Sequence, residues 1–317
     1  MAFNVSALSN YTKENEKQLV FSSVLGNKTA ELIKSSGNVL LEVKSSEQIG
    51  IMDTDAFFQS GASCGFNASG TTTFTQRAVT VGKIKVNEAL CMKDLESKYL
   101  QKALPAGSMY TEMIFAEDYT NRKAQKIADQ LETALWNGDT ASADGNLNKF
   151  DGLLKLITAA GGSVVNANTS TYISGGPIAS ITVANVVSVF DAIYTAIPAK
   201  VVAKDDITIF CGMDTFRLYT VALKNANLFA YNLNVKADSE FFLPGTTVKV
   251  VAVQGLNGTN DLVAARISNL FIGTDILDEQ SKFELFYARE ADQMRFVSEF
   301  KMGIQFAFPD EVVKFFI

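Results

Sequence analysis

The sequence feature that most constrains the fold is a long amphipathic stretch from Glu112 to Trp136. Its apolar residues recur at three- and four-residue steps, as in a helix that buries a single stripe. The stripe consists of Ala116, Ala124, Ile127, Leu131 and Leu135, and the predicted outer face carries Lys123, Lys126, Asp129 and Glu132. At 1.5 Å per residue the helix would be about 37 Å long, so we expect other elements to pack along it. We expect Asn137-Gly138 to supply the left-handed residue that ends it.

Length and hydropathy set the size and class of the protein. A chain of 317 residues exceeds what one hydrophobic core usually organises, so we expect two domains plus extensions. No apolar run approaches the roughly 18 to 20 residues that span a bilayer. The first residues lack a basic start followed by an apolar block, so we expect no signal peptide. These features predict a soluble protein, without a membrane partner, that stays in the cytoplasm where it is made.

The absence of histidine excludes several kinds of active site. No Ser-His-Asp or Cys-His arrangement can form, and no imidazole can hold zinc. Cys64, Cys91 and Cys211 lie far apart and form no C-x-x-C pair, which favours reduced thiols over a disulfide framework. We interpret Cys211 as an apolar core residue. The net charge of −6 and the lack of a dense Lys/Arg run argue against a protein that mainly grips phosphates.

Three candidate sites in the sequence have simpler structural interpretations. Residues 139–151 resemble a calcium loop, but Thr140 and Ser142 stand where the two leading carboxylates belong, which favours a solvated loop. The glycines between residues 50 and 70 match neither phosphate-binding pattern. The acid pairs Asp53 with Asp55 and Asp205 with Asp206 are interpreted as turn and cap residues. We therefore predict no catalytic, cofactor-binding or metal-binding residues.

The first 73 residues read as extensions. Residues 1–36 contain two short helical patterns, with Leu19, Val20, Val24 and Leu25 on one face, and make no core of their own. Residues 37–73 begin with alternating Val39, Leu41 and Val43 and continue with four glycines among small polar residues. We expect this second segment to be a hairpin or loop that projects from the body.

The rest of the chain divides into three segments with predicted elements. Residues 74–160 contain a strand at 74–86 whose register slips at Gly82, a helix at 90–104, the long helix and a short helix after residue 150. Residues 161–280 contain a helix stopped by Pro198, a buried strand at 207–211, a helix to residue 223 capped by Asp214, and strands at 247–253 and 262–267. Residues 281–317 contain a long alternating strand at 294–308, closed by Pro309.

This order of elements resembles the major capsid protein of tailed double-stranded DNA bacteriophages, the Hong Kong 97-type fold. The resemblance also rests on phrases in the same order. They are LETALWNGD at 131–139, FDGLL at 150–154, SNLFIGTD at 268–275 and MGIQFAFPDEVV at 302–313. It implies an α+β fold with an N-terminal arm at 1–36, an extended loop at 37–73, a peripheral domain begun at 74–160 and completed at 281–317, and an axial domain at 161–280.

The resemblance also implies a function and partners. The chain would be a structural protein, not an enzyme, that assembles in the bacterial host cytoplasm into pentamers and hexamers of an icosahedral shell. Its other partners would be scaffolding, portal and decoration proteins and packaged DNA, contacted non-specifically, and it would need no cofactor. Some members join subunits by a Lys–Asn isopeptide bond; Lys44 is a conceivable donor, but we interpret it as an exposed salt-bridging lysine. The alternatives are an encapsulin-type compartment shell and, from another class, a carboxylate- or magnesium-dependent enzyme.

Overall fold

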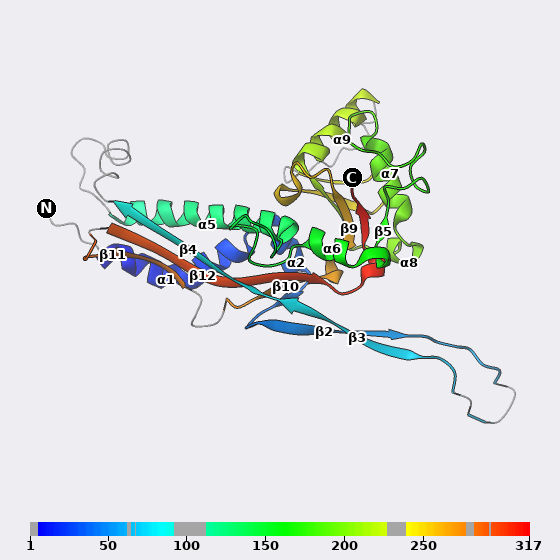
Figure 1. Cartoon of the computed structure of the whole chain (residues 1–317), viewed down its shortest axis with the longest axis horizontal. Helices are drawn as coiled ribbons and strands as arrows, with labels where there is room; N and C mark the ends of the chain where they lie inside the picture. Colours follow the sequence, from blue (N-terminus) through cyan, green and yellow to red (C-terminus); the bar gives the residue numbers. More distant parts are fainter. Residues whose placement is uncertain are drawn as a thin grey trace.

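The computed structural model describes residues 6–61, 65–66, 68–91, 112–226, 239–276, 282–291 and 293–317. The molecule has a long body, a second body at one end of it, and a hairpin that projects beyond both (Figure 1). The long body is built on a five-stranded sheet and the second body on a six-stranded sheet. Helices and strands occur together in both bodies, which confirms the predicted α+β class.

The five-stranded sheet is organised around one long strand, β12 (Gln293–Phe306). β4 (Gly82–Cys91) and β11 (Lys282–Ala288) pair antiparallel with the first part of β12, and β10 (Leu270–Thr274) pairs with its last part. The short β1 (Val39–Leu40) runs parallel to β10. The long strand predicted near the end of the chain is therefore confirmed, and it holds the sheet together.

The six-stranded sheet has the order β5-β13-β9-β6-β8-β7. Its strands are β5 (Val165–Asn166), β13 (Val313–Phe315), β9 (Leu262–Arg266), β6 (Ile207–Gly212), β8 (Lys249–Val253) and β7 (Glu240–Phe242). All residues of β6 are buried, as predicted. The helices α7 (Val186–Ala196), α8 (Ala199–Val202) and α9 (Met213–Asn225) share a hydrophobic core with this sheet. Asp214 is not the cap of α9, because Gly212 holds that position.

The chain crosses between the two sheets twice after residue 260. The first crossing runs from β9 to β10 through the 3-10 turn η5 (Ile267–Asn269). The second runs from β12 to β13 through η6 (Pro309–Glu311). Each sheet is therefore built from segments that lie far apart in the sequence.

The predicted long helix is confirmed as α5 (Glu112–Asn137). Ala124, Ile127, Leu131 and Leu135 are buried in the core that also contains Phe296 and Phe300 of β12. The ring of Tyr119 meets that of Phe296 edge-on, with the centroids 6.0 Å apart. The helix thus packs on the five-stranded sheet, and at its C-terminal end it also meets the 3-10 turn η4 (Gln254–Leu256) of the second body.

Two details of α5 differ from the sequence prediction. Neither Asn137 nor Gly138 is left-handed. Gly138 is needed for space instead, because a Cβ there would lie 2.5 Å from the carbonyl oxygen of Ala134 and 2.6 Å from that of Phe150. Glu132 is not on the outer face; it is 2% exposed and bonds to Thr29.

The N-terminal segment packs on its own subunit. The helix α1 (Ser6–Leu25) lies along α5 and β11, and α2 (Lys28–Ser35) follows it, capped by Asn27. The face predicted from Leu19, Val20, Val24 and Leu25 is buried in the main core. The Glu16 carboxylate also accepts a hydrogen bond from the backbone N–H of Phe283. The described part of the expected arm is therefore part of this body's core.

β12 departs from strict alternation in its second half. Its even positions are buried throughout, but Lys301, Gly303 and Gln305 are buried as well. β3 (Thr72–Thr80) covers this second face: the Gln305 side chain donates to the carbonyl of Ala78, and a Cβ on Gly303 would lie 2.1 Å from the carbonyl oxygen of Thr80. Close backbone approach, rather than a bend, explains this glycine.

The segment after residue 37 forms a hairpin, as predicted. β2 (Ser46–Thr54) pairs antiparallel with β3 over nine positions. The alternation predicted from residue 39 is wrong at Leu41, which is 45% exposed, because Glu42 has a φ of 66° and ends the extended run. The predicted slip at Gly82 separates β3 from β4. A Cβ on Gly82 would lie 1.9 Å from the carbonyl oxygen of Lys149. The loop after α5, which contains Lys149, therefore leaves room only for glycine at this position.

Two predicted helices have different outcomes. The helix predicted at 90–104 is wrong at its start, because Leu90 and Cys91 belong to β4, and its remainder lies outside the described residues. The helix predicted after residue 150 is confirmed as α6 (Leu153–Ala159), followed by the 3-10 turn η2 (Gly161–Ser163).

Candidate assembly surfaces

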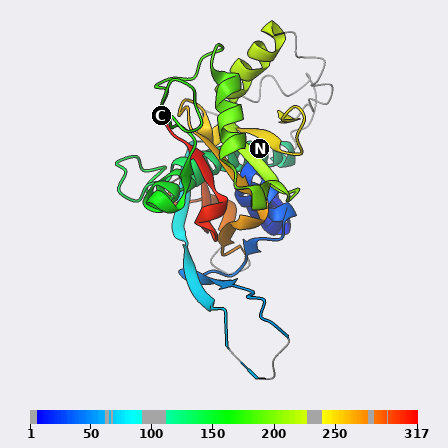
Figure 2. The same cartoon turned by 90° about the vertical axis from the view of Figure 1, so that its right-hand side faces the viewer.

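The projecting hairpin exposes large apolar side chains. Phe58 is 97% exposed and Phe66 93%, and Phe57 and Phe74 are also largely exposed. Met52, 59% exposed, lies directly opposite Phe74 in the register of β2 and β3. Figure 2 shows the hairpin extending away from both bodies, so nothing in the described subunit covers this surface. Exposed apolar groups gathered in this way mark an interaction surface.

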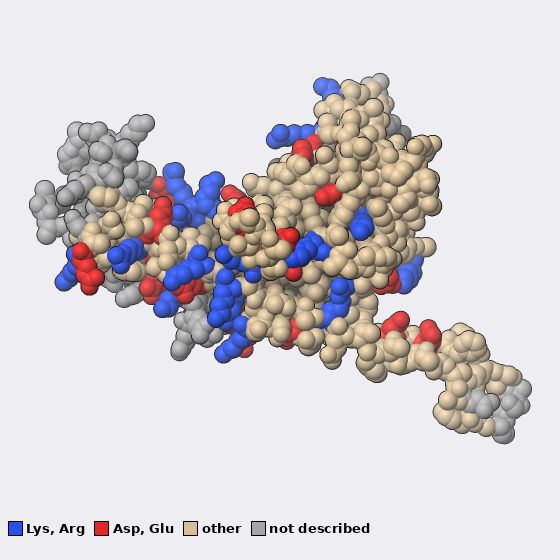
Figure 3. Space-filling model, in the orientation of Figure 1, with Lys and Arg blue, Asp and Glu red and all other residues tan. Residues whose placement is uncertain are grey.

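Beyond its root, which contains Arg77, the same hairpin carries only negative charge. Between residues 46 and 76 the sequence has Glu47, Asp53 and Asp55 and neither Lys nor Arg. Figure 3 shows acidic side chains on the projection, whereas the long body carries Lys and Arg mixed with Asp and Glu. The hairpin therefore presents an acidic, aromatic surface.

The root of the hairpin is fixed to the body while its tip is not. Val79 is fully buried, and the Arg77 guanidinium lies over the ring of Phe306, 4.3 Å from its centroid. Burial lowers the pKa of Arg77. Because these contacts lie only at the base, the outer residues of β2 and β3 add little to the subunit's core.

A groove of about 220 Å³ lies between α5, β4 and the loop after α5. Its apolar wall includes Ile127, Leu131 and Phe300. Lys85, Lys123, Lys126 and Lys149 also line it, and no carboxylate of the described residues does. Within the described residues Lys85 pairs with Glu299, Lys123 with Glu88 and Lys126 with Asp129, whereas Lys149 makes no ion pair. The groove is therefore apolar inside, and most of the lysines at its rim are already paired.

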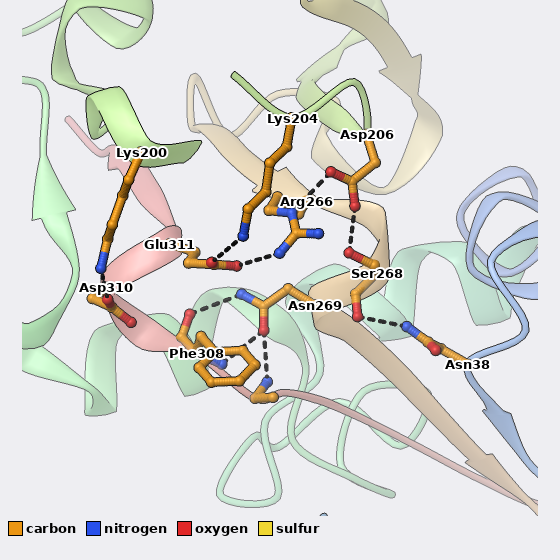
Figure 4. Close-up of polar contacts among 11 residues, drawn as sticks. Asn38, Lys200, Lys204, Asp206, Arg266, Ser268, Asn269, Phe308, Asp310 and Glu311 are labelled. Atoms are coloured by element: carbon orange, nitrogen blue, oxygen red, sulfur yellow. Dashed lines mark hydrogen bonds and ion pairs between the residues drawn. The ribbon is translucent and has the colours of Figure 1, made fainter. Parts of the chain in front are cut away.

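A polar network joins the two sheets where the chain crosses between them (Figure 4). Arg266 donates to Asp206 (2.8 Å) and to Glu311 (3.0 Å), and Lys204 also reaches Glu311 (3.3 Å). Ser268 donates to Asp206 and accepts, through its carbonyl, a 2.7 Å hydrogen bond from Asn38. The network thus ties η5, η6 and the start of β6 to the chain before β1.

Asn269 and the Asp206 carboxylate make further hydrogen bonds at this junction. The buried Asn269 side chain donates to the carbonyl of Phe308 and accepts from the N–H groups of Ala307 and Phe308. Burial opposes ionisation of Asp206, but hydrogen bonds from Arg266 and Ser268 outweigh it and lower the pKa of that carboxyl. The junction is therefore held by charged pairs, and it fixes how the two crossings lie side by side.

The acid pairs singled out in the sequence lie in two unrelated places. Asp53 and Asp55 are exposed on the hairpin, with Asp53 inside β2 rather than in a turn. Asp206 belongs to the charged junction, and Asp205 is exposed beside it. The structure gives these two pairs different surroundings and does not bring them together into one site.

Lys44 and the cysteines lie in different surroundings. Lys44 lies just before β2 and is exposed, as expected, and makes no ion pair with another described residue; its salt bridge stays a prediction. Cys211 is fully buried in the core, as predicted, and burial raises the pKa of its thiol. Cys91 is exposed, and Cys64 lies outside the described residues.

The loop that resembles a calcium site is filled by a lysine. Lys155 Nζ lies 2.6 Å from Asp139 Oδ1 and 2.7 Å from Asp151 Oδ1. The hydroxyl and N–H of Thr140 also donate to Asp151. The hydrogen bond that Lys155 donates to Asp139 holds the pKa of that carboxyl below its usual value. An ammonium therefore occupies the position that a cation would take in this loop.

Sequence reasoning missed the residues that connect distant segments. Glu132 looked like an outer-face charge because its partner Thr29 lies 103 residues earlier. Arg266 lay in no motif, and Glu311 lay in the phrase MGIQFAFPDEVV without a role of its own, although both flank the crossings between strands. Their only local signal was the position of charged residues next to apolar strand ends.

No helix within the described ranges is long and apolar enough to cross a membrane.

Comparison with known proteins gives matches of structure only. No protein-family model and no curated protein matches the sequence. A chain of the satellite phage P4 procapsid is similar with a TM-score of 0.61 and 11% identity, over 95% of this chain and 90% of that chain. A cyanophage A-1(L) capsid chain has a TM-score of 0.58 and 11% identity, over 91% and 92%.

A virus-like particle from Pyrococcus furiosus is also similar, with a TM-score of 0.51 and 9% identity, over 95% of this chain and 98% of that chain. All three matches span nearly the whole of both chains. At such low identity they establish the fold and nothing finer. The chain has the fold of tailed-phage capsid proteins, the Hong Kong 97-type fold.

Proposed function

We propose that this chain is the major capsid protein of a tailed bacteriophage and assembles into the icosahedral shell around its double-stranded DNA. The observation that carries the proposal is the β2–β3 hairpin, which exposes Met52, Phe57, Phe58, Phe66 and Phe74 to solvent in the isolated subunit. Exposed apolar surface of this kind marks a contact with a partner, and a closed shell would give every copy such a contact with its neighbours.

The arrangement of the two bodies supports this role. A long body, a second body at one end and a hairpin that projects beyond both provide contact surfaces at opposite ends of the molecule. We assign the five-stranded sheet with α5 to the peripheral part of the subunit and the six-stranded sheet to the axial part. Rings of five and six copies would place the axial parts at the centre.

The structural role extends to partners and location. We propose a non-enzymatic protein of the virion capsid that is assembled in the bacterial cytoplasm with separate scaffolding and portal proteins. The junction acids are paired with Arg266 and Lys204, and Asp139 and Asp151 with Lys155, so these carboxylates already have structural partners. An encapsulin-type shell remains the second candidate, because a virus-like particle shares the fold as the phage capsid chains do.

DNA contact in this proposal is weak and non-specific. The net charge of −6 leaves few phosphate contacts, so subunits should release duplex DNA at moderate salt. Containment would come from the closed wall.

Electron microscopy of the chain, expressed alone and with its scaffolding protein, tests the proposal. We expect rings or closed particles tens of nanometres across, with duplex DNA in particles purified from virions. A stable monomer under every condition would contradict a shell protein, and an enclosed cargo protein instead of DNA would favour the second candidate.

A further inference from the structure

We propose that α2 is a strut that sets the orientation of the second body relative to the long body. The helix follows α1, and Figure 1 shows it below the C-terminal end of α5, near where the two bodies meet. It packs against α5, β10 and the crossing η5. Displacement of the N-terminal helices would therefore release the second body to turn. The inference goes beyond the proposed function, because it concerns the single subunit.

The apolar residues of α2 lie in a core that the two bodies share. Ala30 and Ile33 are fully buried. The cluster that contains them includes Ile304 of β12 in the long body and Val253 and Val263 of the six-stranded sheet in the second body. Other residues of that sheet pack in a separate cluster with α7 and α9. α2 therefore contributes to the packing that joins the two sheets.

Trp136 of α5 links α2 to the second body. Its indole N–H donates to the Thr29 hydroxyl at 3.0 Å, and its ring centroid lies 5.1 Å from that of Phe210 in β6. A Cβ on Gly255 of η4 would lie only 2.4 Å from the indole Cδ1. Because the ring is packed this closely, Thr29 helps to fix a side chain against which the second body rests.

Polar contacts at the two ends of α2 reach separate parts of the second body. At the start of the helix, Lys28 Nζ lies 3.7 Å from Glu240 Oε1 of β7, and Glu240 Oε2 lies 2.7 Å from Lys249 Nζ of β8. After its end, the Asn38 side chain donates a 2.7 Å hydrogen bond to the Ser268 carbonyl in η5. The Glu240 side chain is 13% exposed, so solvent screens its pairs less than those at the open surface.

The contact at β7 is well placed to stop the second body from turning. The chain enters and leaves that body through β5, β9 and β13, which are neighbours at one side of the six-stranded sheet. β7 forms the opposite edge of the same sheet. Connections at one side alone would act as a hinge. A contact at the far edge, such as that of Lys28 with Glu240, restrains rotation about this hinge because it has the longest lever arm.

Distances between spin labels on the two bodies test the strut. One label would be attached at Gln125→Cys on α5 and the other at Lys224→Cys on α9, both exposed positions, in a chain carrying Cys64→Ser and Cys91→Ser. A control chain would carry Ser188→Cys on α7 with Lys224→Cys, so that both labels lie within the second body. Thermal melting would verify that each labelled chain folds.

The test variant is Lys28→Met with Thr29→Val, which removes the ion pair and the hydroxyl. It should broaden the distribution of distances between the two bodies at least about twofold, since the hinge is then less restrained. The conservative variant Lys28→Arg with Thr29→Ser keeps a cation and a hydroxyl at these positions and should leave the distribution unchanged. Glu240→Gln weakens the same ion pair from the second body and should also broaden it.

The outcomes decide the proposal without reference to shell assembly. An unchanged distribution between the bodies in the folded test variant would overturn it. Equal broadening in the control chain would also overturn it, because the second body itself would then have loosened. If the test variant does not melt cooperatively, an unchanged distribution in Glu240→Gln overturns the proposal instead. The subunit is measured by itself, so a failure to form particles would count against the proposed function alone.

Discussion

Glu132 of α5 and Thr29 of α2 form a buried clasp between segments 103 residues apart. Glu132 Oε2 accepts a 3.1 Å hydrogen bond from the Thr29 N–H, and Oε1 accepts from its hydroxyl at 2.5 Å. The Trp136 indole N–H donates to the same hydroxyl at 3.0 Å. Through these contacts the N-terminal helices are fastened to the long helix.

Removing the Thr29 hydroxyl should loosen this clasp. Thr29→Val keeps the shape but takes partners from Glu132 and Trp136, so we expect a loss of about 1 to 3 kcal/mol in the free energy of unfolding. Burial raises the pKa of Glu132, although the hydrogen bonds from Thr29 oppose that rise. A raised folded-state pKa means that this group's stability contribution falls as pH rises through that pKa. The hydrogen bonds from Thr29 favour the ionised carboxylate, so the pKa of Glu132 should rise further in the variant. The penalty should then be larger at neutral pH than in acid, as measured by denaturant unfolding; an equal penalty would contradict an ionised Glu132.

Truncating the core of α5 should destabilise the subunit strongly. Leu131 is 4% exposed among the residues that pack on β12. Leu131→Ala leaves a cavity and should cost about 2 to 5 kcal/mol in denaturant unfolding. Gln125→Ala, on the exposed side of the same helix, is the control and should change little. A loss below about 1 kcal/mol for Leu131→Ala would mean that the helix packs more loosely than described.

Shortening the hairpin should separate folding from assembly. Because residues 46–54 pair with 72–80, both strands must be trimmed together. We would replace residues 53–73 by an Asn-Gly turn, which suits a two-residue hairpin. The subunit should melt cooperatively near the wild-type temperature and form no shells, as measured by calorimetry and particle sizing. Unfolding of the subunit, or intact assembly, would contradict the role assigned to this segment.

The junction between the sheets should depend on pH through Arg266. Arg266→Met leaves Asp206 and Glu311 without their shared partner and should cost about 1 to 3 kcal/mol at neutral pH. The pKa of Asp206 is lowered in the folded state. The contribution of Asp206 to the free energy of unfolding is therefore present above the ordinary aspartate pKa. It is lost as pH falls through the lowered folded-state pKa. The difference between the variant and wild type should shrink in strong acid, and a constant difference would argue that the arginine acts through packing alone.

Asp261 should oppose stability at neutral pH. Burial raises the pKa of Asp261 to about 6, although a hydrogen bond with the Ile317 backbone acts in the opposite direction. The folded state therefore favours the neutral form, and stability from this group is lost as pH rises through about 6. After allowance for solvent screening, Asp261→Asn should stabilise the protein by roughly 1 kcal/mol at neutral pH. The gain should vanish below the ordinary aspartate pKa, which thermal melts across pH would reveal.

The sequence by itself determined the elements whose burial follows a local period. The three- and four-residue steps of Ile127, Leu131 and Leu135 predicted α5, and the alternation from Met294 predicted β12. The small polar residues and glycines after residue 45 predicted a projection with little core of its own. Each signal lies within one element, because it reflects how a helix or strand turns one face to the interior.

Only the tertiary structure decided what lies against the second face of each element. Glu132 is buried because Thr29 arrives from the N-terminal helices. Gly303 and Gln305 are buried where β3 covers β12, and Lys301 is buried where it pairs with Asp275. The same holds for the groove, whose lysines come from β4, α5 and the loop after it. Such contacts join residues far apart in the chain, and a local period carries no record of which distant segment will pack there.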